Sequence, residues 1–359
     1  AGSGAGLDGF EEGEILAVGG ADLAQRARSL GFSVVDRASL AALELEILRL
    51  RTPLAARTKD ALRIFRKAFP GAVADVNGHI RPAARSRGWN AARTVGWPDS
   101  PLRCGRDITI GMIDTPVDAA HQAFLGRDIR YKSFLKGNHA PADPQHGTAV
   151  AALLVGDPNS DGFGGLLPEA TLIAAGIFER SRTGQTVGNV YALLRALDWM
   201  VRERVRVVNL SLETRENAVL SRALDRSLRG GRILIAAAGN GGAGARPAFP
   251  AAHPQVLAVT AIDPGLEPYA HANHGSYIDF AAPGVSLWTA VPGGGRFQSG
   301  TSFAAPFLTA VAALQVRAGV EPSAEAIRGS LVRSVRDLGA PGKDEVFGWG
   351  LLSFTPSCG

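Results

Sequence analysis

The sequence predicts an α/β protein whose main domain is built on a doubly wound parallel sheet, preceded by a small α+β domain. From about residue 107 onward, short apolar segments alternate with helical patterns, which is typical of parallel strands covered by helices on both faces. Before residue 83 the segments follow a different order. The chain has 359 residues, 46% of them hydrophobic and 20% charged. That length suffices for about two domains of ~150 residues, and this composition excludes a disordered chain.

The first 82 residues follow the order strand, helix, strand, strand, helix, strand. Apolar periodicity predicts strands at 14–18, 33–36, 43–50 and 72–80, and helices at 23–30 and 58–69. Gly31 ends the first helix, and Pro70 with Gly71 ends the second. This order predicts a ferredoxin-like domain, a small sheet with two helices on one face. The pattern contains no candidate catalytic residue.

Residues 83–103 have a different composition. Arg85, Ser86, Arg87 and Gly88 come close together, and Pro98 and Pro101 follow. This composition predicts an irregular, exposed linker, which is a natural place for proteolytic cutting. The second domain is then expected at 104–359.

Five apolar segments predict the parallel strands of that second domain. They lie at 108–113, 171–177, 205–210, 233–237 and 256–261. The clearest helix between them carries its apolar residues on one face, namely Val190, Leu193, Leu194, Leu197, Met200 and Val201. In a doubly wound sheet, functional residues gather at the carboxyl ends of the strands. The residues that follow these strands are therefore the first candidates for a functional site.

Four polar residues are candidates. Asp114 follows the strand 108–113, and Asn240 follows the strand 233–237. His146 and Ser302 each lie near the start of a helical pattern, where free backbone N–H groups favour a developing negative charge. Taken singly, each has an ordinary explanation as a turn residue, a helix cap or a structural histidine. Together, in this order and with their flanking sequences, they indicate a catalytic site.

The flanking sequences resemble those of the subtilisin-like serine proteases. The matching motifs extend over about 104–317 and are Ile113-Asp114-Thr115, His146-Gly147-Thr148, Val208-Asn209-Leu210-Ser211-Leu212, Ala238-Gly239-Asn240, Ala281-Ala282-Pro283-Gly284 and Gly300-Thr301-Ser302-Phe303-Ala304-Ala305-Pro306. The successive intervals of 32, 94 and 62 residues between Asp114, His146, Asn240 and Ser302 also fit that family. The chain order Asp, His, Ser separates it from the other common folds that carry such a triad.

The resemblance implies a serine endopeptidase that acts on polypeptides. His146 would take the proton of the Ser302 hydroxyl during attack and return it to the leaving amine. Asp114 would fix the tautomer of His146 and stabilise its imidazolium form. The Asn240 side-chain amide and the Ser302 backbone N–H would bind the oxyanion. This chemistry requires no cofactor.

The resemblance also implies where the substrate binds. Ser211 and Leu212 would form one wall of the primary specificity pocket, and Ala237, Ala238 and Gly239 would form the other. Glu213 stands where the family usually has glycine. Its carboxylate either favours a basic substrate residue, or only narrows the pocket and points to solvent. The sequence leaves both alternatives open.

By the same resemblance, residues 1–82 would be a propeptide that serves as folding chaperone and product-like inhibitor of a zymogen. Cutting is then expected between Pro82 and about Asn90. Two alternatives to a general endopeptidase stay open. One is a maturation protease of narrow specificity for a single partner, and the other is a non-catalytic binding protein whose cleft the propeptide blocks.

A loop at 157–162 resembles the start of a calcium-binding loop. It offers Asp157, Asn159 and Asp161 as metal ligands. An EF-hand is excluded because its twelfth position is occupied by Pro168 instead of Glu. Proteases of the family often hold calcium in this loop, so a structural Ca²⁺ is one interpretation. A polar turn without metal is the other.

Composition and charge narrow the remaining possibilities. The net charge is +5, but the arginines are scattered along the sequence. They are not combined with aromatic residues that could stack on bases, so we expect no nucleic-acid partner. No apolar run reaches the ~18 residues that span a bilayer. Residues 1–6 are typical of a mature end left after signal removal, or of an added segment, and we expect an exported protein in the periplasm, on the cell surface or outside the cell. Cys104 and Cys358 either form one bridge or are two unrelated thiols.

Overall fold

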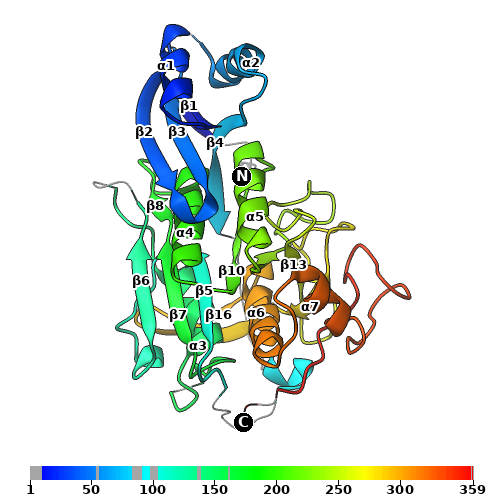
Figure 1. Ribbon diagram of the computed structural model, residues 1–359. Helices are drawn as coiled ribbons and strands as arrows, with labels where there is room; N and C mark the ends of the chain where they lie inside the picture. Colours follow the sequence, from blue (N-terminus) through cyan, green and yellow to red (C-terminus); the bar gives the residue numbers. More distant parts are fainter. Residues whose placement is uncertain are drawn as a thin grey trace.

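The computed structural model describes residues 10–53, 56–82, 91–97, 104–135, 139–160, 162–356 and 358. Its first part, drawn in blue in Figure 1, consists of β1 (Phe10–Val18), α1 (Ala21–Ser29), β2 (Ser33–Leu40), η1 (Ala41–Leu43), β3 (Leu45–Arg51), α2 (Thr58–Ala68) and β4 (Ala74–Pro82). The four strands pair antiparallel in the order β2-β3-β1-β4. This is the strand order of a ferredoxin-like sheet, and the elements follow one another as the sequence predicts.

The two faces of this small sheet pack against different partners. Ile15 and Ala17 of β1 belong to a core shared with α1 and α2. Leu16 points to the opposite face, where it joins the core of the second domain together with Ile47 of β3. Successive strand side chains alternate between the faces, so one apolar strand serves both cores. Both faces of the first domain are therefore covered.

The second domain contains a sheet of seven parallel strands in the order β14-β13-β12-β10-β5-β7-β6. Their bounds are β5 (Thr109–Asp114), β6 (Ile129–Ser133), β7 (Thr171–Gly176), β10 (Val207–Leu210), β12 (Ile233–Ala237), β13 (Leu257–Ile262) and β14 (Phe280–Pro283). The helices are α3 (Gln145–Val155), α4 (Val190–Arg202), α5 (Ala218–Arg229), α6 (Thr301–Arg317) and α7 (Ala324–Leu331). This confirms the predicted doubly wound α/β fold.

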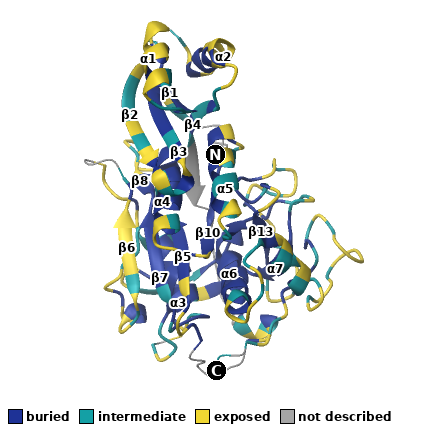
Figure 2. Ribbon diagram, viewed as in Figure 1, coloured by how far each residue is buried: buried dark blue, intermediate teal, exposed yellow. Residues whose placement is uncertain are grey.

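Helices cover both faces of this sheet. Ile110 and Met112 of β5 pack in the same core as α3 and α6, whereas Ile113 lies in the core that contains α4 and α5. The central strands and the side of α6 that meets them are buried in Figure 2. Continuous apolar strands were predicted for this reason, since both faces of each strand need an apolar partner.

The remaining elements connect the two domains or line the edges of the second. They are η2 (Ala92–Val95), η3 (Gln122–Phe124), β8 (Phe178–Arg180), β9 (Thr186–Asn189), β11 (Leu212–Glu213), β15 (Leu287–Val291) and β16 (Gly294–Gln298). The strand β4 of the first domain pairs antiparallel with β9 on one side and β11 on the other. One sheet therefore continues from the first domain into the second.

The prediction of an exposed linker over 83–103 is wrong for Ala91, Val95 and Trp97, whereas Arg93 and Gly96 are exposed. Val95 and Trp97 are buried in the core of the second domain, and Trp97 contacts the ring of Phe354. Burying these apolar side chains determines the position of the segment, although polar and proline residues lie around them in the sequence. The second domain therefore already includes η2, and within the described residues no helix is long and apolar enough to cross a membrane.

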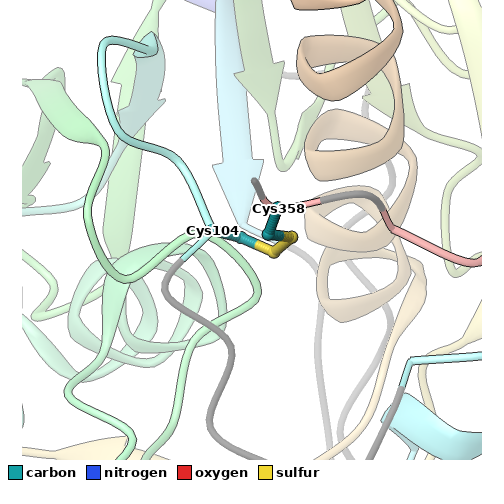
Figure 3. The surroundings of a disulfide bond; sticks show 2 residues. All are labelled: Cys104 and Cys358. Carbon is teal, nitrogen blue, oxygen red and sulfur yellow. A yellow bond between two sulfur atoms is a disulfide. The ribbon is translucent and has the colours of Figure 1, made fainter.

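Cys104 and Cys358 form a disulfide, which is one of the two alternatives that the sequence left open. Figure 3 shows the bond joining the segment before β5 to the C-terminal tail. The two residues are 254 positions apart in the sequence. The bridge therefore closes nearly the whole second domain into one covalent loop.

Candidate active site

The four candidate residues lie at one edge of the parallel sheet. Asp114 is the last residue of β5, and Asn240 comes three residues after the end of β12. His146 and Ser302 are the second residues of α3 and α6. The chain leaves β5 toward β7 on one side and reaches β10 and β12 on the other. Ligands of such folds bind where the strand order reverses in this way.

Asp114 and His146 are joined by a short hydrogen bond. Oδ1 of Asp114 lies 2.6 Å from Nδ1 of His146, and the same oxygen accepts a bond of 2.6 Å from the Thr115 backbone N–H. Asp114 is fully buried. Gly147 lies so close to the Thr115 backbone that a Cβ on it would stand 2.4 Å from the Thr115 carbonyl oxygen. Only glycine permits this approach, which brings α3 against the end of β5.

The hydroxyl of Ser302 does not bond to the imidazole in this conformation. Ser302 Oγ donates to the Ser211 carbonyl at 3.3 Å, and His146 Nε2 has no hydrogen-bond partner among the described residues. The His146 ring lies against the ring of Phe303, the residue next to Ser302, with 5.3 Å between ring centroids. Catalytic hydrogen bonds are often unformed before substrate binds. A rotation about the Ser302 Cα–Cβ bond changes the direction of the hydroxyl without moving the backbone.

The backbone carbonyl of Ser302 is bonded by Ser211, the residue that follows β10. Pro306 has no N–H group, so α6 lacks the bond that would end on the Ser302 carbonyl. Ser211 Oγ donates to that carbonyl at 2.7 Å and in turn accepts from Asn209 Nδ2 at 2.8 Å. Thr309 donates to Asn209 Oδ1 at 3.0 Å. Sequence reasoning missed this chain of bonds, although a proline four residues after the serine inside a helix is a signal for it.

Asn240 is oriented by the start of α6. Its Oδ1 accepts from the Thr301 backbone N–H at 3.0 Å and from Thr301 Oγ1 at 3.2 Å. These bonds consume the carbonyl oxygen of the side chain. Its Nδ2 is buried and has no partner in the part of the chain that the structure describes. An amide with its oxygen fixed and its nitrogen available is suited to donate to an oxyanion.

The predicted pocket walls extend from two neighbouring strands. Ser211 follows β10, and Leu212 and Glu213 form β11; Ala237 ends β12, and Ala238 and Gly239 follow it. Tyr277 donates to the Ala238 carbonyl at 2.6 Å, and burial raises the pKa of its phenol, so it stays a neutral donor at neutral pH. Glu213 does not turn away from the pocket, because its Oε2 accepts from the Asn240 backbone N–H at 3.2 Å.

Of the three predicted calcium ligands, the structure describes Asp157 and Asn159. Asn159 donates to Oδ1 of Asp157 through both its backbone N–H, at 3.0 Å, and its side-chain Nδ2, at 3.1 Å. Asp161 lies outside the described residues. No group of three or more His, Cys, Asp or Glu that could hold a metal occurs within the described ranges. The bonds between Asp157 and Asn159 are those of a polar turn, one of the two interpretations that the sequence left open.

A buried carboxylate bonded to an imidazole, with a serine at the start of the adjacent helix, is typical of serine hydrolases. The family model described as "Subtilase family" matches residues 105–350. The chain therefore belongs to the subtilase family, which is a family of serine endopeptidases.

Known proteins of this family resemble the chain to different extents. The Minor extracellular protease Epr of Bacillus subtilis is 28% identical over 281 residues, which cover 77% of this chain but only 41% of Epr. The crystal structure of fervidolysin from Fervidobacterium pennivorans, titled a keratinolytic enzyme related to subtilisin, has a TM-score of 0.79 at 20% identity and shows the shared fold. That alignment covers 96% of this chain and 61% of fervidolysin. The Prenylagaramide maturation protease PagA has a TM-score of 0.59 at 27% identity, over 70% of this chain and 92% of PagA.

Proposed function

We propose that the chain is a serine endopeptidase in which Ser302 is the nucleophile, His146 the general base and Asp114 the residue that orients it. The observation that carries this proposal is the 2.6 Å bond between Asp114 and His146, with the imidazole lying against the first turn of α6. The other nitrogen of the ring, Nε2, is then the one that meets the hydroxyl. No cofactor takes part in the steps below.

In this mechanism, the Ser302 side chain rotates about its Cα–Cβ bond when substrate binds. The hydroxyl then turns from the Ser211 carbonyl toward His146. The hydroxyl oxygen attacks the peptide carbonyl while its proton passes to Nε2 of His146. Asn240 Nδ2 and the Ser302 backbone N–H donate to the oxyanion. The proton then passes to the leaving amine, and water activated by the same histidine releases the acyl group. Asp114 stays ionised and stabilises the imidazolium.

We further propose that residues 1–82 form an inhibitory propeptide. The support is the position of β4, which lies between β9 and β11 and pairs with both in antiparallel fashion. An extended peptide substrate would bind by adding a strand between β9 and β11 in the same way. The first domain also rests on α4, where the buried Asp198 accepts from the backbone N–H groups of Ala42 and Leu43 at 2.9 and 3.2 Å. These contacts would template the slow folding of a parallel sheet.

The register of β4 supports one position for the proposed cut. Pro82 pairs with Leu212, and the residue before Leu212 is Ser211, whose carbonyl lies 3.3 Å from Ser302 Oγ. The expected cutting range, 83–90, lies outside the described residues. Continuing the register by one residue in the sequence assigns the bond that follows Ala83. We therefore expect mature protein to begin at Ala84.

The test compares the wild type with Ser302→Ala and, as a matched control, with Ser276→Ala, an exposed serine of the same domain. We expect wild type and Ser276→Ala to hydrolyse casein and to yield a new N-terminus at Ala84. Ser302→Ala should retain the full-length chain and lose hydrolysis. If Ser302→Ala cleaves casein at the wild-type rate, the nucleophile is another residue.

Two alternatives are tested by the same material. The similarity to the maturation protease PagA supports an enzyme that acts on one precursor. In that case, profiling the cleavage of a peptide library would give a single narrow recognition sequence. A blocked binding protein would fail to react with a fluorophosphonate probe both before and after removal of residues 1–83.

The disulfide and the similarity to the extracellular protease Epr support export to an oxidising compartment. A structural calcium ion at the 157–161 loop would show as a lower melting temperature in EDTA.

A further inference from the structure

Glu213 crosses from one wall of the pocket to the other. It belongs to β11 on the first wall, yet its Oε2 accepts from the backbone N–H of Asn240, which comes directly after the second wall. The two walls leave neighbouring strands, since Leu210 of β10 pairs with Ala236 of β12. A side chain that reaches from one to the other lies in the space between them.

The space beside Gly239 is already filled. A Cβ on Gly239 would stand 2.8 Å from Glu213 Oε2, 2.5 Å from Asn273 Nδ2 and 2.9 Å from the Cβ of Ala248. These contacts leave no room for a further carbon atom at the wall, and a φ of +104° already restricts this position to glycine. A long substrate side chain that entered along this wall would meet Glu213 and Asn273.

The backbone that carries Glu213 is fixed on both sides. Thr214 exchanges two backbone hydrogen bonds with Phe249, its N–H donating at 2.7 Å and its carbonyl accepting at 2.9 Å. Asn273 Nδ2 donates to the Arg246 carbonyl at 3.3 Å. The Asn273 backbone N–H donates to the Gly239 carbonyl at 3.0 Å, so Asn273 ties the opposite wall of the pocket to the 246–249 loop. Both walls are therefore held on one segment, and Glu213 Oε2 is held in the space between them by its bond to the Asn240 N–H.

We propose that Glu213 closes the primary specificity pocket and limits the enzyme to a small residue, such as alanine, on the amino side of the cleaved bond. This inference rests on the proposed function and names its substrate class. A basic substrate residue is the competing interpretation, but its side chain would need the volume that Glu213 itself fills. The chain's own sequence agrees, because Ala83 follows Pro82, the last residue of β4, and would stand on the amino side of the proposed cut.

The experiment measures kcat/KM on three peptides, Ala-Ala-Pro-X-p-nitroanilide with X as Ala, Phe or Arg. For the wild type, we expect the Ala peptide to exceed the Phe and Arg peptides by at least about 10-fold, the typical discrimination of a hydrophobic pocket by size. Glu213→Gly should open the pocket and raise the ratio of Phe to Ala by about 10-fold or more. Glu213→Gln, which has the same size without the charge, should keep the preference for Ala.

The same measurement also identifies the opposite outcome. A wild type that prefers Arg, and loses this preference in Glu213→Gln, would establish a charge-reading pocket and overturn the proposal. An unchanged Phe-to-Ala ratio in Glu213→Gly would overturn it as well. Glu213→Ala replaces Glu213→Gly if the latter does not fold, with the same expected ratio.

Active-site titration separates this inference from the proposed function. Each variant is labelled with a fluorophosphonate probe, and rates are divided by the labelled fraction. No labelling in the wild type would mean that the serine peptidase function itself is wrong. Labelled enzyme whose preferences ignore the size of residue 213 would mean that only the pocket assignment is wrong.

Discussion

The Cys104–Cys358 disulfide fixes the C-terminal tail onto the start of the second domain, and its removal has a predictable cost. The two cysteines are 254 residues apart. In the chain-entropy description, closing a loop of that length lowers the entropy of the unfolded chain by an amount worth about 5.5 kcal/mol at 25 °C. Native disulfides typically contribute about 2–5 kcal/mol, so we expect a loss of about 3–5 kcal/mol on replacing both cysteines by alanine. For a domain of this size, that loss lowers the melting temperature by roughly 6–9 °C.

The assay uses the Ser302→Ala background so that self-digestion does not obscure unfolding. Thermal and guanidinium unfolding are followed with and without reductant. Reductant should lower the melting temperature of the parent but leave Cys104→Ala/Cys358→Ala unchanged, which makes the double variant its own control. Mass spectrometry of the parent without reductant should show the loss of two hydrogens.

Two results would refute the reasoning. Free thiols in the purified parent would show that the bridge does not form. Equal melting temperatures with the bridge closed and open would show that the tail is held by other contacts. The structure offers such contacts, since the Phe354 N–H donates to the Val95 carbonyl at 2.8 Å and the Phe354 ring meets Trp97. The difference in melting temperature therefore measures what the covalent bond adds to this packing.

Two further predictions address catalysis and pH. Asn240→Ala removes the buried amide that would donate to the oxyanion, so kcat should fall by about 10²–10³-fold with little change in KM. This loss of transition-state stabilisation, ~2.7–4 kcal/mol, is already known for one such donor in a subtilisin. Steady-state kinetics that show an unchanged kcat would contradict this role. Burial lowers the pKa of His253 below the ordinary histidine value of 6.5 despite the nearby Asp225. Its stabilising contribution is therefore full above about pH 6.5 and is lost as the pH falls, because the unfolded chain then binds the extra proton. Guanidinium midpoints at pH 7.5 and 5.5 should differ less in His253→Gln than in its Ser302→Ala parent, and an equal difference would exclude this contribution.

The order of the elements was predictable because both domains place apolar residues at regular positions. The strand predicted at 233–237 is β12 with the same bounds, and the helix predicted at 58–69 is α2 at Thr58–Ala68. Asp114 was expected to follow its strand and is instead the last residue of β5. Such shifts of one residue depend on pairing with neighbouring strands, which a single segment does not record.

Other strands had no readable pattern. β6 is an edge strand in which four of the five residues are exposed, so an apolar run is neither needed nor present. β16 begins with two glycines and is formed by pairing with β15. β9 and β11 are short, and both pair with β4. β9 also pairs with β8 of its own domain, whereas the ladder of β11 depends on the contact with β4, which local sequence cannot show.

The candidate site was predictable as a set of residues but not as a geometry. Chain order and flanking motifs select Asp114, His146, Asn240 and Ser302, and the fold brings them to one edge of the sheet. The direction of the Ser302 hydroxyl and the path of the Glu213 side chain depend on neighbours from other strands. Ser211 and Asn240 supply these neighbours, respectively, and lie 91 and 27 residues away in the sequence.

The regular backbone structure is interrupted at three residues beside the candidate site. Gly300 has a φ of 148° directly before α6. Pro306 leaves the Ser302 carbonyl without a helical partner, and Ser211 replaces that partner. Gly239 has a φ of +104° directly before Asn240, whose side chain then accepts from Thr301. Because a buried polar group without a partner costs about 1–3 kcal/mol, these replacement bonds are required for the interruptions to persist. The bonds from Ser211 to the Ser302 carbonyl and from Thr301 to Asn240 Oδ1 are therefore what holds the Ser302 backbone and the Asn240 amide at this end of the sheet.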